Sequence, residues 1–374
     1  MKAKKVAIVH DWLYGGGAEQ VVLELHRMYP QAPIYTSYAT TEWRNKLDDK
    51  VVTGYLNRWP FSRLRKFLPL LRQRWFAKLD LSEYDLVLSS SGNGEAKFVQ
   101  VKGDALHICY CHTPTHFYWR HYDKYLEHPG FRPYWLVRFA LRLLVKPLRR
   151  RDYQAAQRVD YFVANSSHIR DDIRQYYQRE STVVFPPVDV ERFKKPITTQ
   201  RSGFVTHGRQ VPYKRFDLLI EACNEAKVKL TVIGRGPEHQ RLKQLAGPTV
   251  KLRNDVDNDE LPKLLAKAKG YLFAAHEDFG IAPVEAMAAG TPVAAYEAGG
   301  ALDYVIANKT GVFFAEQSVA AIIQAIDKMQ SIDWDYDVIT THARAFSAGS
   351  FRQQMAATIK NITTEHAQRE KSAR

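Results

Sequence analysis

The stretch HEDFGIAPVEAMAAGTP, residues 276–292, holds two glutamates that are eight positions apart. Glu277 precedes a helix-like run, and Glu285 lies within the first turns of that run. Pro283 suits the first turn of a helix, and Gly290 suits its end. The two acids could form an active site, or they could belong to an ordinary helix. Because one precedes the helix and the other lies on it, we expect both to face one bound ligand at different points.

The turn between these glutamates offers backbone donors. The first N–H groups of a helix have no partner within the helix, and the helix dipole places partial positive charge there. The N–H groups near Phe279, Gly280 and Ile281 are therefore expected to point toward a bound anion.

Two cations follow another apolar run, GFVTHG at 203–208. Arg209 and Lys214 lie where an expected strand ends and the next helix begins. Such a pair could neutralise a diphosphate, the arginine through its planar fork and the lysine as a point charge. Arg215 is the competing cation, and we expect it to face solvent or to pair with Asp217.

Glycines mark two further turns between an expected strand and a helix. The run 15–17 follows the apolar stretch KVAIVH, and Gly234 ends the stretch KLTVIG. Without side chains, Gly16 and Gly17 would let backbone N–H groups approach a phosphate at the helix N-terminus. Any tight turn can use glycine, and the GxGxxG spacing is absent, so a turn without a ligand is the alternative.

Short apolar runs alternate with helical patterns along the chain, which indicates parallel sheets covered on both faces. The segment 185–203 has three prolines and no clear period, and is the best linker candidate. It predicts two doubly wound α/β domains, 1–185 and 186–345, with ligands bound at the carboxyl ends of the strands in a cleft between them. The expected strands are 5–10, 85–90, 105–111, 161–165, 203–208, 229–234, 271–275 and 292–296.

Composition and cysteine content narrow the class of protein. The 374 residues are 45% hydrophobic and 12% aromatic, which excludes a disordered chain. Three cysteines cannot build a disulfide framework, which favours a reducing cytoplasm. No run approaches the ~18 apolar residues of a membrane span. The apolar run before His10 is only about five residues long, too short for a signal peptide, so we expect a cytoplasmic protein.

The net charge of +14 is concentrated in two segments, 58–78 and 131–151. Each holds seven lysines or arginines and no acid, and the remaining 40 basic residues balance the 40 acidic ones. Basic faces beside Trp, Phe and Leu suit a helix on the surface of an anionic membrane. A solvated basic face over a core-facing stripe is the alternative, and nucleic-acid binding is disfavoured because no known motif is present. In the second segment one stripe at helical spacing consists of Leu141, Leu144, Val145 and Leu148.

Together these stretches resemble the retaining glycosyltransferases of family 4, which have the GT-B fold of two facing Rossmann-like domains. The glutamate–seven–glutamate motif of that family corresponds to Glu277 and Glu285, and its G-R-x-x-x-x-K element corresponds to 208–214. GGGAE at 15–19 matches the glycine turn of the first domain, and HTP at 112–114 matches its histidine element. The resemblance covers most of the chain and implies that a last helix, 346–374, returns to the first domain.

The resemblance also implies roles for individual residues. Arg209 and Lys214 would bind the donor diphosphate and stabilise it as the leaving group. Glu277 would bind hydroxyls of the donor sugar, Glu285 would hold the ribose, and His112 would lie near the reacting centre. Because Glu277 faces hydroxyls, same-face attack assisted by the leaving phosphate is favoured over a double displacement. Backbone contacts to the donor are implied for Gly16, Gly17, Gly234, Phe279, Gly280 and Ile281.

The donor and acceptor follow from a narrower resemblance. VAIVHDWLYGGGAE, the segment beginning CYCHTP, and VPYKRFDLLIEA are most similar to GDP-mannose-dependent mannosyltransferases of bacterial surface-polysaccharide assembly. We expect GDP-mannose as donor, with a UDP-sugar as the nearest alternative, and a lipid-linked or glycan acceptor at the inner face of the cell membrane. No cofactor beyond the donor and no nucleic-acid partner are expected. A non-catalytic protein that binds a sugar nucleotide or lipid is the alternative of another class, against which the four charged motif residues argue.

Two other patterns look like metal sites. The triplets Asp257-Asn-Asp259 and Asp333-Trp-Asp335 resemble the DxD metal motif of the other glycosyltransferase fold. Parallel sheets are the wrong context for that motif, so no metal is expected. Cys109 and Cys111 beside His112 lack a second Cys/His pair, so we interpret them as buried thiols rather than as half of a zinc site.

Overall fold

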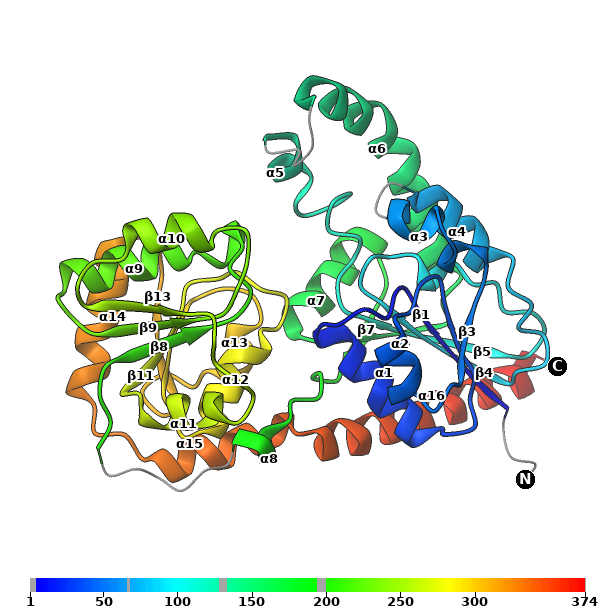
Figure 1. Ribbon diagram of the computed structural model, residues 1–374. Helices are drawn as coiled ribbons and strands as arrows, with labels where there is room; N and C mark the ends of the chain where they lie inside the picture. The colour runs from blue at the N-terminus through cyan, green and yellow to red at the C-terminus, as the bar shows by residue number, and fades with distance from the viewer. Residues whose placement is uncertain (1–4, 66–67, 128–132, 194–199, 374) are drawn as a thin grey trace. The chain divides into compact units, whose positions relative to one another are not determined.

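The computed structural model describes residues 5–65, 68–127, 133–193 and 200–373 and divides the chain into two compact units (Figure 1). The first unit is Met1–Pro186 with Phe351–Arg374, and the second is Pro187–Ser350. Each unit is built on one parallel sheet with helices between successive strands. The expected fold class, two Rossmann-like doubly wound domains, is confirmed.

The sheet of the first unit has seven parallel strands in the order β3-β2-β1-β4-β5-β6-β7. Its central strands are buried along their whole length because they are covered on both faces. The register pairs His10 with Ser90 and Ser90 with Tyr110, so the ends of three strands lie level. The strands are β1 Val6–His10, β2 Ile34–Thr36, β3 Val51–Thr53, β4 Leu86–Ser91, β5 Leu106–Cys111, β6 Tyr161–Ala164 and β7 Ser181–Val183.

Among its described residues, the first unit has seven α-helices before the crossing to the second. Several begin at polar caps of the usual kind: the Thr40 side chain accepts from the Trp43 N–H, and that of Ser166 from the Ile169 N–H. No helix among the described residues is long and apolar enough to cross a membrane. The helices are α1 Gly17–Met28, α2 Thr41–Lys46, α3 Phe61–Leu64, α4 Pro69–Ala77, α5 Tyr122–Glu127, α6 Tyr134–Gln157 and α7 Ser167–Asp172.

The C-terminal half of α6 is fixed to the first unit by a buried carboxylate. Asp152 is fully buried and accepts four hydrogen bonds, so its charge is compensated on all sides. Burial lowers the pKa of Lys97, but Asp152, with smaller contributions from other groups, leaves the pKa above its ordinary value, so the lysine stays charged beside this acid. The four donors are Lys97 Nζ at 2.7 Å, Thr115 Oγ1 at 2.9 Å, Trp119 Nε1 at 2.9 Å and Tyr177 Oη at 2.8 Å.

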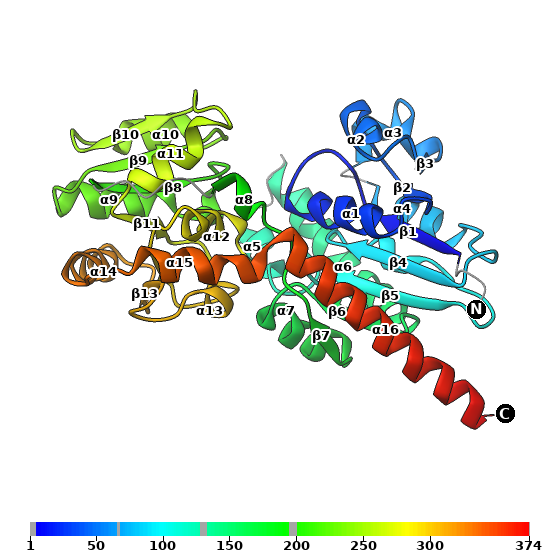
Figure 2. The same cartoon turned by 90° about the horizontal axis from the view of Figure 1, so that it is seen from below.

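The C-terminal helix α16 (Ala348–Ala373) completes the core of the first unit from Phe351 onward. Figure 2 shows it running along this unit. Arg352 on this helix pairs with Glu24 of α1. Residues three or four apart lie on one face of a helix, and α16 buries such a face beside β1, β4 and β5 through Phe351, Met355, Ile359 and Ile362.

The sheet of the second unit has six parallel strands in the order β10-β9-β8-β11-β12-β13. The strands are β8 Phe204–His207, β9 Leu230–Ile233, β10 Val250–Arg253, β11 Gly270–Phe273, β12 Val293–Tyr296 and β13 Gly311–Phe314. The helices are α8 Val190–Phe193, α9 Phe216–Glu225, α10 His239–Leu245, α11 Glu260–Lys267, α12 Ile281–Ala288, α13 Ala301–Tyr304, α14 Val319–Ser331 and α15 Tyr336–Ala343.

All eight strands expected from the apolar runs are present, but the sequence did not predict β2, β3, β7, β10 and β13. Each of these five has only three or four residues, and each lies at or next to the edge of its sheet. An edge strand is exposed on one side, so it needs no continuous apolar run and gives a weaker pattern.

The expected linker is largely part of the second unit. The division between the units falls at 186/187, and the next residues pack inward rather than forming a free connection. Val188, Val190 and Phe193 are buried, and the Val188 N–H donates to the carbonyl of Phe346 at 2.9 Å. Pro186 and Pro187 therefore mark the crossing point, but the whole of 185–203 is not a linker. Residues 194–199 lie outside the described part of the chain.

Candidate active site

The first of two groups of site residues lies at the carboxyl edge of β8, where Lys214 meets Glu277. The Nζ atom of Lys214 is 2.6 Å from Oε1 of Glu277, and their side chains are only 15% and 18% exposed. Burial lowers the pKa of Lys214, but the Glu277 carboxylate, with smaller contributions from Tyr213 and Glu285, leaves the pKa above its ordinary value, so the ammonium stays charged. The structure thus keeps a largely buried cation and anion together at the end of a parallel strand.

Gly208 makes room for this lysine. It has a φ of +143°, which favours glycine, and a Cβ here would lie 3.3 Å from the Lys214 ammonium nitrogen. Gly234, at the end of β9, packs its backbone so closely against Gly208 that any side chain would overlap the Gly208 carbonyl. The carbonyl of Gly234 also accepts from Nε2 of Gln210 at 3.0 Å. Close approach of the two strand ends is therefore enough to require glycine at 234, with or without a ligand.

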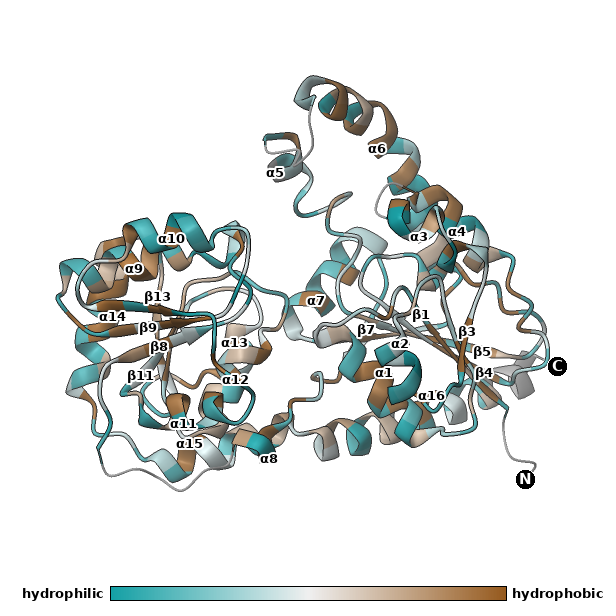
Figure 3. Cartoon of the chain, viewed as in Figure 1, coloured by the Kyte–Doolittle hydropathy of each residue, from teal (hydrophilic) through white to brown (hydrophobic). Residues whose placement is uncertain are grey.

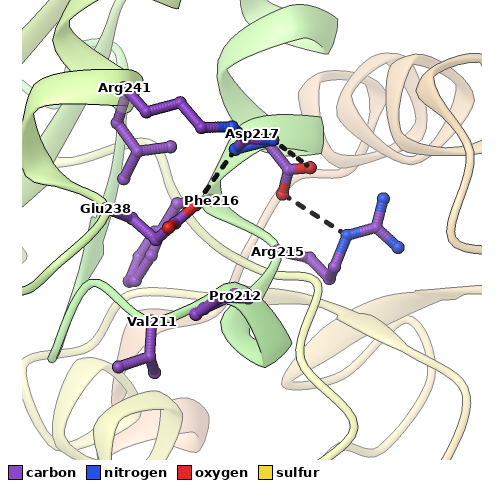
Figure 4. Close-up of a pocket in the computed structure, with 8 residues that line it drawn as sticks. Val211, Pro212, Arg215, Phe216, Asp217, Glu238 and Arg241 are labelled. Carbon is purple, nitrogen blue, oxygen red and sulfur yellow. Dashed lines mark hydrogen bonds and ion pairs between the residues drawn. The ribbon is translucent and has the colours of Figure 1, made fainter. Parts of the chain in front are cut away.

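The other two cations of this segment differ from Lys214. Arg209 is exposed, so its guanidinium lies at the surface beside this site. Arg215 pairs with Asp217, with Nε 3.3 Å from Oδ1, which confirms the expectation for the competing cation. Figure 4 shows Asp217 between Arg215 and Arg241 in a small pocket next to these residues. The charges that line this pocket are satisfied by one another, and neither Lys214 nor Glu277 lines it.

Glu285 has a partner of its own. It lies on α12, and its Oε2 atom is 2.8 Å from Nε2 of His207, the last residue of β8. The two glutamates of the opening motif therefore bind two different side chains, Lys214 and His207, rather than each other. Both pairs lie at the same end of β8, so two separate polar positions adjoin along one strand edge.

The turn before α12 is held in an unusual conformation. Gly280 has a φ of +91°, and a Cβ there would lie 2.8 Å from the hydroxyl oxygen of Tyr304, so only glycine fits. The ring of Phe279 is buried against Tyr304 and Phe346, with centroids 5.5 and 5.9 Å apart. Only the backbone of Phe279 could therefore contact a ligand. The N–H groups of Gly280 and Ile281 open α12, where the helix dipole favours an anion.

A second glycine pair, which the sequence did not single out, fixes this turn. The N–H of Gly300 donates to the carbonyl of Glu277 at 2.9 Å. Side chains at Gly299 or Gly300 would overlap the backbone of Glu277 and Phe279 respectively. The sequence position of this pair could have identified it, because the pair lies shortly after the carboxyl end of β12, and ligands bind at such strand ends in doubly wound sheets.

The second group of site residues surrounds His112, just after β5 in the first unit. Nε2 of His112 is 2.8 Å from the hydroxyl of Ser90, and Nδ1 of His10 is 2.9 Å from the Ser90 carbonyl oxygen and 3.1 Å from its hydroxyl. A carbonyl can only accept, so the His10 Nδ1 carries a proton. The Ser90 hydroxyl also shares a hydrogen bond with Nε2 of His112, in which either atom can be the donor.

The ring of His112 is neutral. Burial, with a smaller contribution from His10, lowers the pKa of His112 to about 3. The side-chain amide of Asn165 donates to the His112 carbonyl at 3.0 Å and holds the backbone. Nδ1 of this neutral ring can make one hydrogen bond to a ligand without adding charge to its surroundings.

Asp11 organises the loop beside His112 and was not singled out as a candidate. It is buried at the carboxyl end of β1, and its carboxylate accepts from the N–H groups of Gly92 at 2.7 Å, Asn93 at 2.6 Å and Ala96 at 2.6 Å. Asp11 and Ser90 share one signal in the sequence. Each is a polar residue at the carboxyl end of a buried parallel strand, and such ends meet at one edge of the sheet.

The glycine turn at 15–17 is already occupied in part. Oε1 of Glu19 accepts from the N–H groups of Tyr14 at 3.3 Å and Gly15 at 3.0 Å. Gly16 is the N-cap of α1, and a Cβ there would lie 2.9 Å from the other carboxylate oxygen of Glu19. An anion at this turn would therefore meet Gly16 and Gly17 next to a carboxylate, a feature that the sequence alone did not reveal.

The patterns that resembled metal sites have structural roles. Oδ1 of Asp257 accepts from the N–H groups of Asp259 and Glu260, at 2.9 and 2.7 Å, at the start of α11. Asp335 caps α15 in the same way. Within the described ranges, no group of three or more His, Cys, Asp or Glu side chains is placed to hold a metal ion. Burial raises the pKa of the Cys109 thiol to about 12, which fits an inert core cysteine.

Comparison with known proteins shows which families and structures the chain resembles. Residues 15–192 match the family described as Glycosyltransferase Family 4, and residues 187–345 match Glycosyl transferases group 1. HepE of Anabaena, solved with UDP and glucose, has a TM-score of 0.65 and 20% identity, covering 96% of this chain and all of that one. That likeness supports the fold, GT-B.

Two curated relatives are each 30% identical over a part of the chain. One is the GDP-Man:Man(3)GlcNAc(2)-PP-Dol alpha-1,2-mannosyltransferase of Xenopus laevis, matched over 46% of this chain and 41% of that protein. The other is a GDP-mannose-dependent alpha-(1-6)-phosphatidylinositol monomannoside mannosyltransferase of Mycobacterium tuberculosis, matched over 38% and 45%. The chain thus spans less than half the length of either relative. By its two matched domains and its fold, the chain belongs to the glycosyltransferases of family 4.

Proposed function

We propose that the protein is a retaining hexosyltransferase that transfers mannose from GDP-mannose to a lipid-linked or glycan acceptor. The observation that carries this proposal is the largely buried Lys214–Glu277 pair at the carboxyl edge of β8. It places a cation suited to a diphosphate next to a carboxylate suited to sugar hydroxyls. Two relatives whose names specify GDP-mannose or GDP-Man support the choice of donor.

The remaining site residues receive roles from their surroundings. Arg209 and Lys214 bind the diphosphate, the backbone of Phe279, Gly280 and Ile281 adds N–H donors, and Glu285 holds the ribose. His207 then orients Glu285, since the two are already hydrogen-bonded. In the first unit, Gly16 and Gly17 are the proposed phosphate-binding residues, and the neutral ring of His112 is the proposed sugar-binding group.

The chemistry is a substitution at the anomeric carbon with retention. The bond from C1 to the diphosphate oxygen breaks, and the electron pair stays on the diphosphate. The acceptor oxygen bonds to C1 on the same face, and its proton passes to the departing phosphate. Negative charge grows on the diphosphate as the bond breaks, so Lys214 and Arg209 stabilise the transition state more than the ground state.

A UDP-sugar is the alternative donor, since the structurally similar HepE was solved with UDP and glucose. The proposals for the acceptor and for the place of the reaction rest on other observations than the proposal for the donor. The names of both relatives include a lipid, PP-Dol or phosphatidylinositol, and the two basic segments suit an anionic surface. We therefore place the reaction at the inner face of the cell membrane.

A donor screen tests the proposal. The full chain would be melted with GDP, GDP-mannose, UDP and UDP-glucose, and nucleotide release would be measured with lipid-linked and free saccharide acceptors. At 100 times its Kd a ligand stabilises the folded protein by about 2.7 kcal/mol, so the preferred nucleotide should give a clear rise in Tm. Stabilisation by UDP alone would identify the alternative donor. Stabilisation without nucleotide release under any condition would indicate a binding protein, and no stabilisation by any nucleotide would contradict the proposal.

A further inference from the structure

The N-terminal half of α6 differs from the anchored half that ends at Gln157. In Figure 1 it extends, together with α5, beyond the rest of the first unit. The anchored half buries Val145, Leu148, Asp152 and the two alanines at 155 and 156. Toward the N-terminus no residue of α6 before Val145 is buried. The helix is thus fixed at one end and presents its other end to solvent.

The solvent-facing side of this half is largely apolar, with the exposed Arg142 among its apolar residues. Trp135, Phe139 and Leu143 are 70%, 62% and 64% exposed. They are four residues apart, so they lie on one face of the helix. Figure 3 shows hydrophobic residues around this part of α6, and the neighbours that are also exposed are Tyr134, Leu136 and Leu144. A contiguous apolar surface of this kind on a monomer marks an interaction site.

The same face becomes basic toward the C-terminus. Lys146 and Arg150 are exposed and follow Trp135 by eleven and fifteen residues, which places them on its side of the helix. No acidic residue occurs in 134–151. Not every arginine of α6 is available: Arg138 donates to the carbonyls of Leu126 and Glu127, and Arg149 donates to that of Tyr118.

This arrangement separates the two interpretations that the sequence left open. A core-facing stripe accounts for Val145 and Leu148 but fails for Leu144, which is 43% exposed, and for the Trp135, Phe139 and Leu143 face. The other basic segment, 58–78, adjoins α6 through Arg151, whose Nε donates to Gln73 of α4 at 3.3 Å. Four cations of this segment are exposed: Arg58, Arg63, Arg74 and Lys78.

We propose that the outward face of α6, with Trp135, Phe139 and Leu143 inserted and Lys146 and Arg150 at the headgroups, is a docking surface for an anionic lipid bilayer. An aromatic and aliphatic end next to a purely basic end matches the acyl–headgroup boundary of such a membrane. Charge complementarity argues against a second copy of this chain, which would bring the same basic face. This surface does not depend on which sugar the protein transfers.

Vesicle flotation of the full chain tests the proposal. We expect binding to vesicles that contain about 30% phosphatidylglycerol and little binding to pure phosphatidylcholine. Trp135→Ser/Phe139→Ser/Leu143→Ser should weaken binding on the order of 100-fold. Lys146→Gln/Arg150→Gln should weaken it about 30-fold at low salt and remove most of its salt dependence.

Matched controls lie on the second unit. Val338→Ser removes an exposed apolar residue, and Lys263→Gln/Lys328→Gln removes two exposed cations. These variants should bind vesicles as the parent does. Circular dichroism and the Tm of every variant establish that the fold is intact.

Three results would overturn the proposal: equal binding to neutral and anionic vesicles, no effect of the triple serine variant, or equal losses in the controls. Concentration-dependent dimerisation that disappears in the triple variant would instead assign the face to a second copy. Transfer to a water-soluble acceptor, or donor hydrolysis, should be unchanged in the α6 variants. A protein that docks on membranes but transfers no sugar would refute the proposed function and leave this inference standing.

Discussion

The two groups of site residues are held together by different forces. Around His112, a neutral hydrogen bond with Ser90 holds a ring whose low pKa keeps it uncharged, and Asn165 donates to the backbone carbonyl of the same residue. The Lys214 side chain is held instead by an ion pair with Glu277. The first group is complete without a ligand, whereas the second consists of charges that a ligand can share or replace.

This difference suggests how the second group works. A diphosphate arriving at Lys214 supplies the negative charge that Glu277 provides in the free protein. The carboxylate is then released to accept hydrogen bonds from sugar hydroxyls. Because a largely buried charge without a partner is costly, the exchange links diphosphate binding to the orientation of Glu277. The His112 group needs no such exchange, so its contribution should depend on geometry alone.

The largest effect is expected from breaking the ion pair. Lys214→Ala removes the cation at the diphosphate and should lower kcat/KM about 1000-fold, since groups that meet developing charge contribute most. It also leaves the carboxylate of Glu277 largely buried without its partner, which should lower the free energy of unfolding by roughly 2–4 kcal/mol. Steady-state kinetics and urea unfolding measure the two losses. Lys263→Ala, on the exposed side of α11, is the control, and equal losses in both variants would refute the assignment.

Acid should affect the first unit through its neutral histidines. Burial, aided by Arg158, lowers the pKa of His107 to about 3, while the unfolded chain titrates near 6.5. The unfolded state therefore binds the extra proton first, and stability present above pH 6.5 is lost as the pH falls toward 3. The expected slope from this residue is about 1.4 kcal/mol per pH unit.

Urea unfolding between pH 7 and 5 measures that slope, and His107→Gln should make the decline shallower by this amount. Nε2 of His107 and the Ser89 hydroxyl oxygen are 2.8 Å apart and share one hydrogen bond. A glutamine side chain can make the same bond. An unchanged slope in the variant would show that His107 is protonated in the folded state.

A smaller effect is expected from releasing the His112 ring. Ser90→Ala removes the hydroxyl that bonds Nε2, so this bond no longer fixes the tautomer and the orientation of the His112 ring. We expect kcat to fall on the order of tenfold with little change in KM, because the donor contacts of the second unit are intact. Ser90→Thr retains the hydroxyl and should restore most of the rate. Nitrogen NMR of the histidine rings distinguishes this from simple loss of packing, since only the tautomer model predicts a changed His112 spectrum.

The smallest effect is expected at Arg215. This residue has a φ of +53°, in the left-handed region, and its ion pair with Asp217 is partly exposed. Arg215→Gly relieves the backbone and loses a pair worth at most about 1 kcal/mol. Stability should change by less than about 0.5 kcal/mol and transfer by less than about twofold. A large loss of transfer would mean that Arg215, rather than Lys214 alone, binds the donor.

The sequence predicted the central strands and the position of the motifs because both depend on local patterns. Continuous apolar runs such as 85–90 belong to strands covered on both faces, and Glu277 and Lys214 follow such strands directly. The pairing of these two side chains could not be predicted, since it depends on the order β8-β11 within the sheet. Glycine is likewise required at position 300 because its backbone lies against that of Phe279, a contact between distant parts of the sequence.

The outward face of α6 shows a different limit. Helical periodicity identifies a stripe of apolar residues but not what covers it. Leu144 and Leu148 belong to one expected stripe, yet one is exposed and the other buried, because only the C-terminal half of the helix reaches the core. Asp152, which anchors that half, carried no signal of its own in the sequence.

The most direct test of the exchange at the ion pair is the behaviour of Glu277→Gln. This isosteric change removes the negative charge that competes with the diphosphate for Lys214 but retains the side-chain volume. Calorimetric titration with GDP and the rate of transfer from GDP-mannose would be measured on the same preparation. The account predicts GDP affinity equal to or higher than that of the parent, with transfer reduced about 100-fold or more. Weakened GDP binding together with unimpaired transfer would contradict it.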